Sequence, residues 1–62
     1  MGKLYIAGID LDGVNFKYLG CYQSFDRAKA RCNTSKCFVG EIERNKPQPL
    51  TLEGWVVTYP KA

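Results

Sequence analysis

An Asp-Gly step, Asp12-Gly13, joins two runs of β-forming residues in this chain. The first run extends from Leu4 to Ile9 and the second from Val14 to Tyr22. Aspartate and glycine both tolerate positive φ angles, so the step favours a tight turn between two antiparallel strands. The sequence therefore predicts that the chain begins with a β-hairpin.

Residues of the second strand should alternate between the two faces of the sheet. One face is expected to carry Val14, Phe16, Tyr18 and Tyr22, and the other Asn15, Lys17, Leu19 and Cys21. Neither set is purely polar. We therefore expect a sheet with one buried face and one partly covered face.

The stretch from Ser24 to Asn33 is the one good helix. The Ser24 hydroxyl can accept a hydrogen bond from a free backbone N–H of the first turn. Phe25, Ala28 and Cys32 form a narrow apolar stripe at helical spacing. Such a stripe is suited to packing on a sheet.

Two further strands are expected, at Cys37 to Glu43 and at Gly54 to Tyr59, where Pro60 ends the second. The segment from Asn45 to Pro49 cannot be regular because two prolines remove backbone donors. The element order is thus ββαββ. This order predicts an α+β fold, a single domain over residues 1–62, with one antiparallel sheet and one helix packed on one face.

A chain of 62 residues has a thin core, because a domain of about 60 residues buries only about 60% of the surface of its unfolded form. Hydrophobic residues make up 45% and charged residues 24%, which is typical of a globular protein. Large aromatic side chains remove much apolar area from water, so most of the aromatic residues are expected in the core.

The chain lacks the usual chemistry of an active site. It has no histidine, which is the commonest general base and metal ligand. Glu41 and Glu43 would share a strand face, but a solvated strand surface explains such a pair. Asp10 and Asp12 resemble the start of a calcium loop, yet the later acidic ligands are missing and a hairpin turn accounts for both. We therefore expect no enzyme activity, no metal and no cofactor.

The cysteines Cys21, Cys32 and Cys37 are odd in number, which argues against a complete disulfide framework. A Cys32–Cys37 bridge could close a short loop, but buried thiols are the favoured interpretation. No apolar stretch is long enough for a secretory signal or a membrane span. These features predict a cytoplasmic protein that does not contact a membrane.

The basic residues suggest one kind of partner. The net charge is +3, and all basic residues except Lys3 and Lys61 lie between Lys17 and Lys46. Side chains one helical turn apart could reach phosphates of a nucleic acid. The candidate nucleic-acid-binding residues are Arg27, Lys29, Arg31, Lys36, Arg44 and Lys46. The alternative is that they only keep a small domain in solution.

The stretch YLGCYQSFDRAKARC, from Tyr18 to Cys32, resembles the strand-to-helix step of AP2-like and integrase arm-binding domains. The resemblance is carried by Leu19, Gly20, Phe25, Asp26, Ala28 and Ala30. It implies a strand end, a helix cap and a packing stripe. Those domains read DNA bases with three strands placed before the helix. Here only two strands precede it, and the first carries no basic residue. We interpret the resemblance as a shared way of packing a helix on a sheet, not as membership.

A second kind of partner is another protein. The segment after the prolines is too short to bury all its apolar groups, and a rigid proline segment lowers the entropy cost of presenting them. The candidate protein-binding residues are Pro47, Pro49, Leu50, Leu52 and Trp55. Leu52 and Trp55 could instead complete the core. We favour the core for Trp55 and leave both interpretations open for Leu50.

The leading hypothesis is a small non-enzymatic cytoplasmic binding module that docks on a protein partner and modulates or inhibits it. Small chains of this kind often come from phages or mobile elements and inhibit host factors. Nucleic-acid binding through the basic helix face is the alternative. A third hypothesis is a structural homodimer formed by pairing of edge strands, which an open sheet invites.

Overall fold

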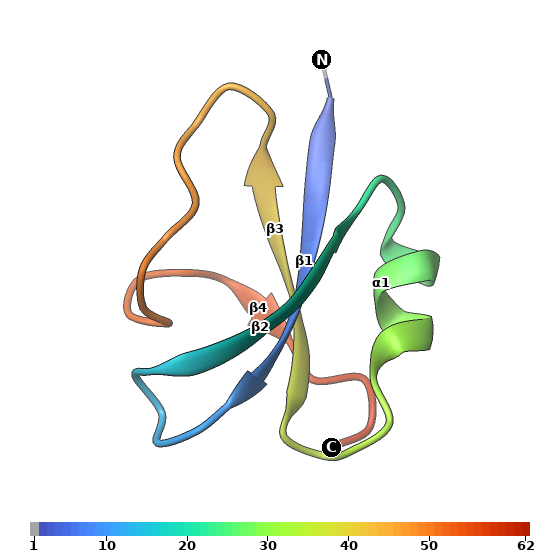
Figure 1. Ribbon diagram of the computed structural model, residues 1–62, viewed down its shortest axis with the longest axis vertical. Coiled ribbons are helices and arrows are strands. Elements are labelled where there is room, and N and C mark those ends of the chain that lie inside the picture. The colour runs from blue at the N-terminus through green and yellow to red at the C-terminus, as the bar shows by residue number, and fades with distance from the viewer. Residues whose placement is uncertain (1) are drawn as a thin grey trace.

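A computed structural model describes residues 2–62 as one four-stranded antiparallel sheet with a single helix (Figure 1). The elements are β1 (Lys3–Asp10), β2 (Phe16–Tyr22), α1 (Phe25–Arg31), β3 (Cys37–Glu43) and β4 (Val57–Thr58). The strand order is β2-β1-β3-β4. This confirms the predicted α+β fold and its ββαββ order.

Strand β1 is the centre of the fold. It pairs antiparallel with β2 on one side and with β3 on the other, so β2 and β3 run parallel to each other. The chain passes from β2 to β3 through α1, which lies against one face of the sheet (Figure 1). The unpaired edges of the sheet are therefore the seven-residue β2 and the two-residue β4.

The helix packs on the sheet as its apolar stripe predicts. Ala28 and Cys32 are buried in a cluster with Ala7 of β1 and with Cys37 and Val39 of β3. The Ser24 Oγ accepts a hydrogen bond from the Arg27 backbone N–H at 3.2 Å, which confirms the predicted N-cap. The helix ends at Arg31, two residues earlier than predicted, because Cys32 has an extended backbone.

The opposite face of the sheet is covered by the C-terminal segment. Phe38 of β3 is fully buried there, and its ring centroid lies 5.4 Å from that of Phe16 and 5.7 Å from that of Trp55. Trp55 lies over Gly40, where a side chain would overlap the indole ring. The Trp55 Nε1–H donates to the Glu41 carbonyl oxygen at 3.0 Å. The sheet is thus covered on both faces, by a helix and by an irregular segment.

The predicted faces of the second strand are wrong at its end. Tyr18 pairs with Gly8 and Tyr22 with Tyr5, and Gly8 and Tyr5 point to opposite faces of β1. A register shift opposite Ala7 and Gly8 leaves one extra residue, Leu19, in β2. This bulge reverses the alternation, so Tyr22 packs on the helix side.

The predicted hairpin is present, with a longer loop than an Asp-Gly turn alone would give. Strand β2 begins at Phe16 and not at Val14. Gly13 adopts a φ of 89°, a conformation that favours glycine. The Asp12 carboxylate accepts hydrogen bonds from the backbone N–H groups of Val14 and Asn15. These bonds and one from the Asn15 side chain lower the pKa of Asp12 below its usual 3.8.

The fourth strand is much shorter than predicted. Gly54 has a φ of 73°, and residues 54–56 turn the chain so that Trp55 covers Gly40. Only Val57 and Thr58 then pair with β3. Residues 54–56 cannot both pair with β3 and place the Trp55 ring over Gly40. They place the ring, so β4 is limited to Val57 and Thr58.

The cysteine prediction is also wrong. Cys32 and Cys37 are both buried, but they form a disulfide, with their Cα atoms 5.2 Å apart. The end of α1 and the start of β3 meet across a four-residue turn, and this brings the two sulfur atoms together. Cys21 lies on the edge strand β2 and is an exposed free thiol. Within residues 2–62, no helix is long and apolar enough to cross a membrane.

Candidate functional site

Two loops that are far apart in the sequence meet at one end of the molecule. The hairpin loop between β1 and β2 closes with a hydrogen bond from the Leu11 N–H to the Asn15 carbonyl oxygen, at 3.0 Å. The Leu52 N–H, in the segment before β4, donates to the Val14 carbonyl oxygen at 2.8 Å. Figure 1 shows the two loops side by side on the left of the view. Leu50 lies two residues before Leu52, which contacts the hairpin.

Three apolar side chains remain exposed on these two loops. The exposed fraction is 91% for Leu50, 58% for Leu11 and 41% for Val14. Val56 is also exposed, at 85%, but it directly precedes β4 and is not counted among the three. We call these three residues the hairpin–loop patch. Their loops are held by the backbone bonds described above. The three side chains therefore belong to loops that are held in place by backbone hydrogen bonds.

The structure separates the residues that the sequence grouped as a protein-binding segment. Leu52 is 8% exposed and belongs to the core. Trp55 is half-buried against Phe16 and Phe38. Pro47 and Pro49 are exposed and half-buried, respectively. Of the candidate residues, Pro47 and Leu50 are thus the exposed ones. Leu11 and Val14, exposed on the hairpin loop, were not among the candidates.

The signal for Leu11 and Val14 was present in the sequence. Leu11 is a large apolar residue between the two aspartates of the predicted turn, and Val14 directly follows its glycine as the first residue of the predicted second strand. A turn is exposed in most folds, so its apolar residues have no core to enter. The second loop could not be placed beside this turn from the sequence, because the contact is formed by tertiary packing.

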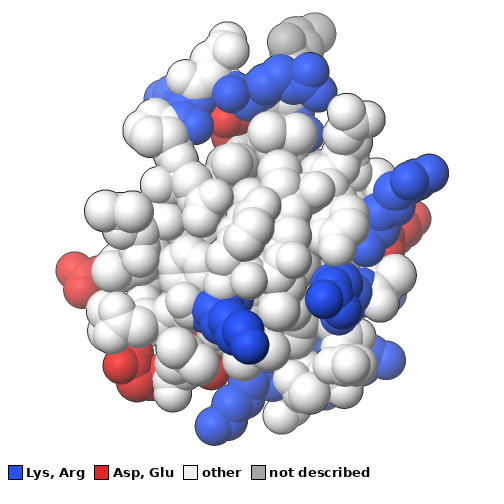
Figure 2. Space-filling model, in the orientation of Figure 1, with Lys and Arg blue, Asp and Glu red and all other residues white. Residues whose placement is uncertain are grey.

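The surroundings of the hairpin–loop patch are acidic. Asp12 and Glu53 are exposed beside it, and residues 10–16 and 47–60 contain no lysine or arginine. In Figure 2 acidic side chains lie at the left and lower-left edge, where Figure 1 places the two loops. Basic side chains lie mainly at the top, the right and the lower centre of the same view. The molecule is therefore electrically asymmetric despite its net charge of +3.

The structure does not bring the six candidate nucleic-acid-binding residues together. Arg27, Lys29 and Arg31 are exposed on α1, whereas Lys36 lies in the turn before β3. The remaining two, Arg44 and Lys46, follow β3 at the other end of that strand. All six are exposed, but they occupy three separate places. A continuous basic stripe is therefore not formed.

Glu41, from the predicted Glu41–Glu43 strand pair, and Asp10, from the hairpin, both have partners in the structure. Glu41 forms an ion pair with Lys3 across the sheet. The hydrogen bond within this ion pair, followed by the negative charge of Glu41, raises the pKa of Lys3 above its usual 10.5. Asp10 accepts hydrogen bonds from the Gly13 N–H at 2.6 Å and from the Tyr59 hydroxyl at 2.9 Å. These groups stabilise the sheet and the hairpin.

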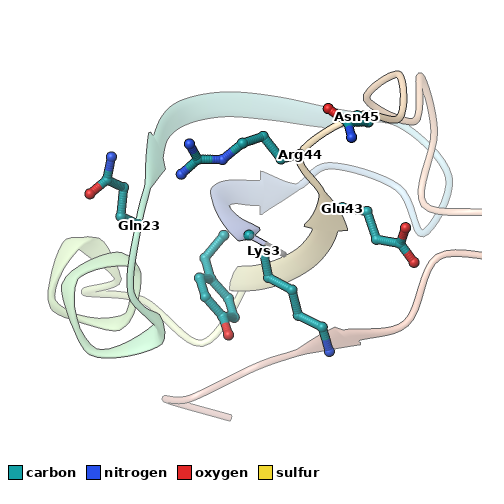
Figure 3. Close-up of a pocket in the computed structure, with 7 residues that line it drawn as sticks. Lys3, Gln23, Glu43, Arg44 and Asn45 are labelled. Atoms are coloured by element: carbon teal, nitrogen blue, oxygen red, sulfur yellow. The ribbon is translucent and has the colours of Figure 1, made fainter.

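A second surface feature lies at the opposite end of the sheet, around the start of β1. It is a hollow of about 750 Å³ (Figure 3). Residues from the ends of β1, β2 and β3 line it: Gly2, Lys3, Tyr5, Gln23, Glu43, Arg44 and Asn45. Five of the seven lining residues are charged or carry side-chain amides, and the other two are Gly2 and Tyr5. No protein-family model, curated protein or solved structure matches this chain.

Proposed function

We propose that this protein is a non-enzymatic binding module that docks on another protein through the hairpin–loop patch and modulates its activity. The observation that carries the proposal is the exposure of Leu50, at 91%, on a loop bonded to a hairpin that exposes two further apolar side chains. An apolar side chain gains free energy when a partner removes it from water. We infer that the three side chains form one contact surface, since contiguous exposed apolar patches are typical of interaction sites.

The acidic surroundings of the patch support one feature of the partner. Charges around an apolar contact steer association and reject partners of like charge more than they add affinity. Asp12 and Glu53 would therefore favour a partner whose apolar pocket is surrounded by lysine or arginine. Raising the salt concentration should slow association with such a partner.

The proposal is tested by affinity capture from a lysate of the source cells with the wild-type protein, Leu50→Asp and Val56→Asp. Val56 is 85% exposed but lines a different hollow, with Val39, Glu41 and Thr58, so it is a matched control. We expect Leu50→Asp to lose a partner that Val56→Asp retains, with both variants as stable as the wild type. Equal capture by all three proteins would show that the patch does not bind.

The cytoplasm is the proposed compartment. Cytosolic thiols keep most disulfides reduced, so the Cys32–Cys37 bond needs protection to persist there. Both cysteines are buried, at 3% and 1% exposure, which hinders attack by an external thiolate.

Nucleic-acid binding is the second candidate function. It is favoured by Arg27, Lys29 and Arg31, which are all exposed on one short helix. A gel-shift with duplex DNA tests it, since binding through phosphates weakens steeply as salt rises. Absence of a shift at low salt would exclude this candidate.

A further inference from the structure

Arg44 is the free cation of the hollow at the start of β1. Within residues 2–62 the ion pair of this region joins Lys3 to Glu41, and Arg44 has no carboxylate within ion-pair distance. In Figure 3 Arg44 extends toward Gln23, whereas Glu43 points away from both. The Lys3 charge is thus offset by Glu41, and the charge of Arg44 is left for a ligand.

The backbone fixes the place of Arg44. Its N–H donates to the Gly2 carbonyl oxygen at 3.1 Å, which extends the pairing of β1 and β3 by one step. The guanidinium lies over Gly2, where an added Cβ would be 2.8 Å from the Arg44 Nε. Glycine at this position therefore leaves the space that the guanidinium occupies.

The other walls of the hollow supply neutral donors and an aromatic ring. Gln23 and Asn45 carry side-chain amides, each with two N–H donors. Tyr5 is half-buried, and its ring packs edge-on against Phe25 with centroids 6.1 Å apart. The ring is held by the core and still contributes to the lining. The volume of about 750 Å³ lies in the range of small-molecule sites, about 300–1,000 Å³.

We propose that this hollow binds a small organic ligand that carries an oxyanion, either a carboxylate or a phosphate, next to a planar ring. The oxyanion accepts two hydrogen bonds from the Arg44 guanidinium, a geometry that suits arginine better than lysine. The Gln23 amide donates a further bond, and the ring of the ligand packs against Tyr5. The site is separate from the hairpin–loop patch, so it does not depend on the proposed function.

Titration with simple probes, followed by NMR of the arginine Nε–H and glutamine side-chain signals, tests the site. Phenyl phosphate and benzoate carry a ring with each kind of oxyanion, inorganic phosphate lacks the ring, and benzyl alcohol lacks the charge. We expect phenyl phosphate or benzoate to shift the Arg44 and Gln23 signals, and the tighter of the two identifies the oxyanion. Inorganic phosphate should bind more weakly, and benzyl alcohol should not shift Arg44.

Arg44→Gln is the decisive variant and Arg31→Gln its control, because each removes one exposed arginine charge. We expect Arg44→Gln to weaken binding of the ring-bearing oxyanion at least tenfold, and Arg31→Gln to change it less than twofold. Thermal melts check that both variants stay folded. Equal losses in the two variants would show unspecific attraction to a basic protein and overturn the proposal. Absence of shifts at Arg44 with every probe would overturn it as well.

Discussion

Two glycines inside strands determine how closely aromatic rings approach the sheet. A Cβ at Gly8 would lie 2.8 Å from the Phe38 ring, and a Cβ at Gly40 would overlap the ring of Trp55. Glycine weakens a strand interior, and it often marks a close approach of other groups. At Gly8 and Gly40 the missing side chain lowers strand propensity but leaves space for the aromatic rings that cover the sheet face opposite α1.

Gly40→Ala should therefore destabilise the protein. The new methyl group must push Trp55 outward, which strains the packing around Phe38 and weakens the hydrogen bond from the Trp55 Nε1–H to the Glu41 carbonyl oxygen. We expect a loss of about 1–3 kcal/mol in the free energy of unfolding. Urea unfolding followed by tryptophan fluorescence measures it. A change below about 0.5 kcal/mol would contradict the packing described for this face.

Tyr59 connects the C-terminal segment to the hairpin. Its hydroxyl donates to the Asp10 carboxylate at 2.9 Å. Burial, followed by this hydrogen bond and the charge of Asp10, raises the pKa of Tyr59 above its usual 10.0. A raised pKa in the folded state gives stability that is fully present below pH 10.0 and is lost as the pH rises through the folded-state pKa.

Tyr59→Phe removes both the hydrogen bond and this titration. We expect the variant to lose about 1 kcal/mol at neutral pH. Above pH 10.0 the difference from the wild type should shrink, because the wild type loses its own contribution there. Urea unfolding from pH 7 to pH 11 measures both effects. If the stability difference between Tyr59→Phe and the wild type stays constant from pH 7 to pH 11, folding does not raise the pKa of the Tyr59 hydroxyl.

At the level of elements, the sequence predicts well those helix and strand ends that depend on neighbouring residues in the chain. The bounds of the strand from Cys37 to Glu43 match the structure, because a buried run followed by prolines leaves little choice. The helix start was predicted by its cap at Ser24. The bulge at Leu19 was not, since alternation of side chains cannot reveal one inserted residue. The shortened β4 was missed because the competing contact of Trp55 is tertiary.

The Cys32–Cys37 disulfide joins the end of α1 to the start of β3. In the chain-entropy description a bond that closes so short a loop contributes about 2 kcal/mol by constraining the unfolded chain. The variant with both cysteines changed to serine should lose at least this amount, because it also places hydroxyls at buried positions. Changing both to alanine avoids the hydroxyls, and its loss then combines the missing bond with the packing of two buried sulfur atoms. If the alanine variant is as stable as the wild type, the bond does not stabilise the fold.

Cys21 should react as the one accessible thiol of the native protein. It is exposed on β2, whereas the other two cysteines are buried and bonded. A chromogenic disulfide reagent should therefore release one equivalent of thiol before unfolding, and none from Cys21→Ser. Release of three equivalents after unfolding in the absence of reductant, in place of one, would show that Cys32 and Cys37 are reduced. This outcome would support a reducing compartment.

At the scale of the whole molecule, the sheet is covered by α1 on one face and by an aromatic segment on the other. Of the exposed large apolar side chains, Leu11, Val14 and Leu50 lie on the two loops that meet, whereas Tyr18 lies on β2 and Val56 directly precedes β4. The sequence singled out Leu50 but could not decide between core and surface, since burial depends on where the loop folds. It does not single out Leu11, which lies in the predicted turn, or Val14, which is predicted to begin the second strand, whereas β2 begins at Phe16 and leaves Val14 in the loop.

The β2 edge offers a further test at this scale. Pairing of two β2 strands would give a homodimer, since β2 is a seven-residue strand with one charged residue, Lys17. The bulge at Leu19 twists the edge, and bulges of this kind protect edges from pairing. We therefore expect a monomer in sedimentation at every concentration used to measure binding. A dimer that Tyr18→Pro abolishes would instead support edge pairing.

The central claim is that the hairpin–loop patch contacts another protein. It is tested most directly by placing the photo-cross-linking residue p-benzoylphenylalanine at position 50 or at position 56 in the source cells. Both positions are highly exposed, at 91% and 85%, and only position 50 belongs to the patch. The account predicts a discrete cross-linked product from position 50 that position 56 does not give. No product from position 50, or the same products from both positions, would contradict it.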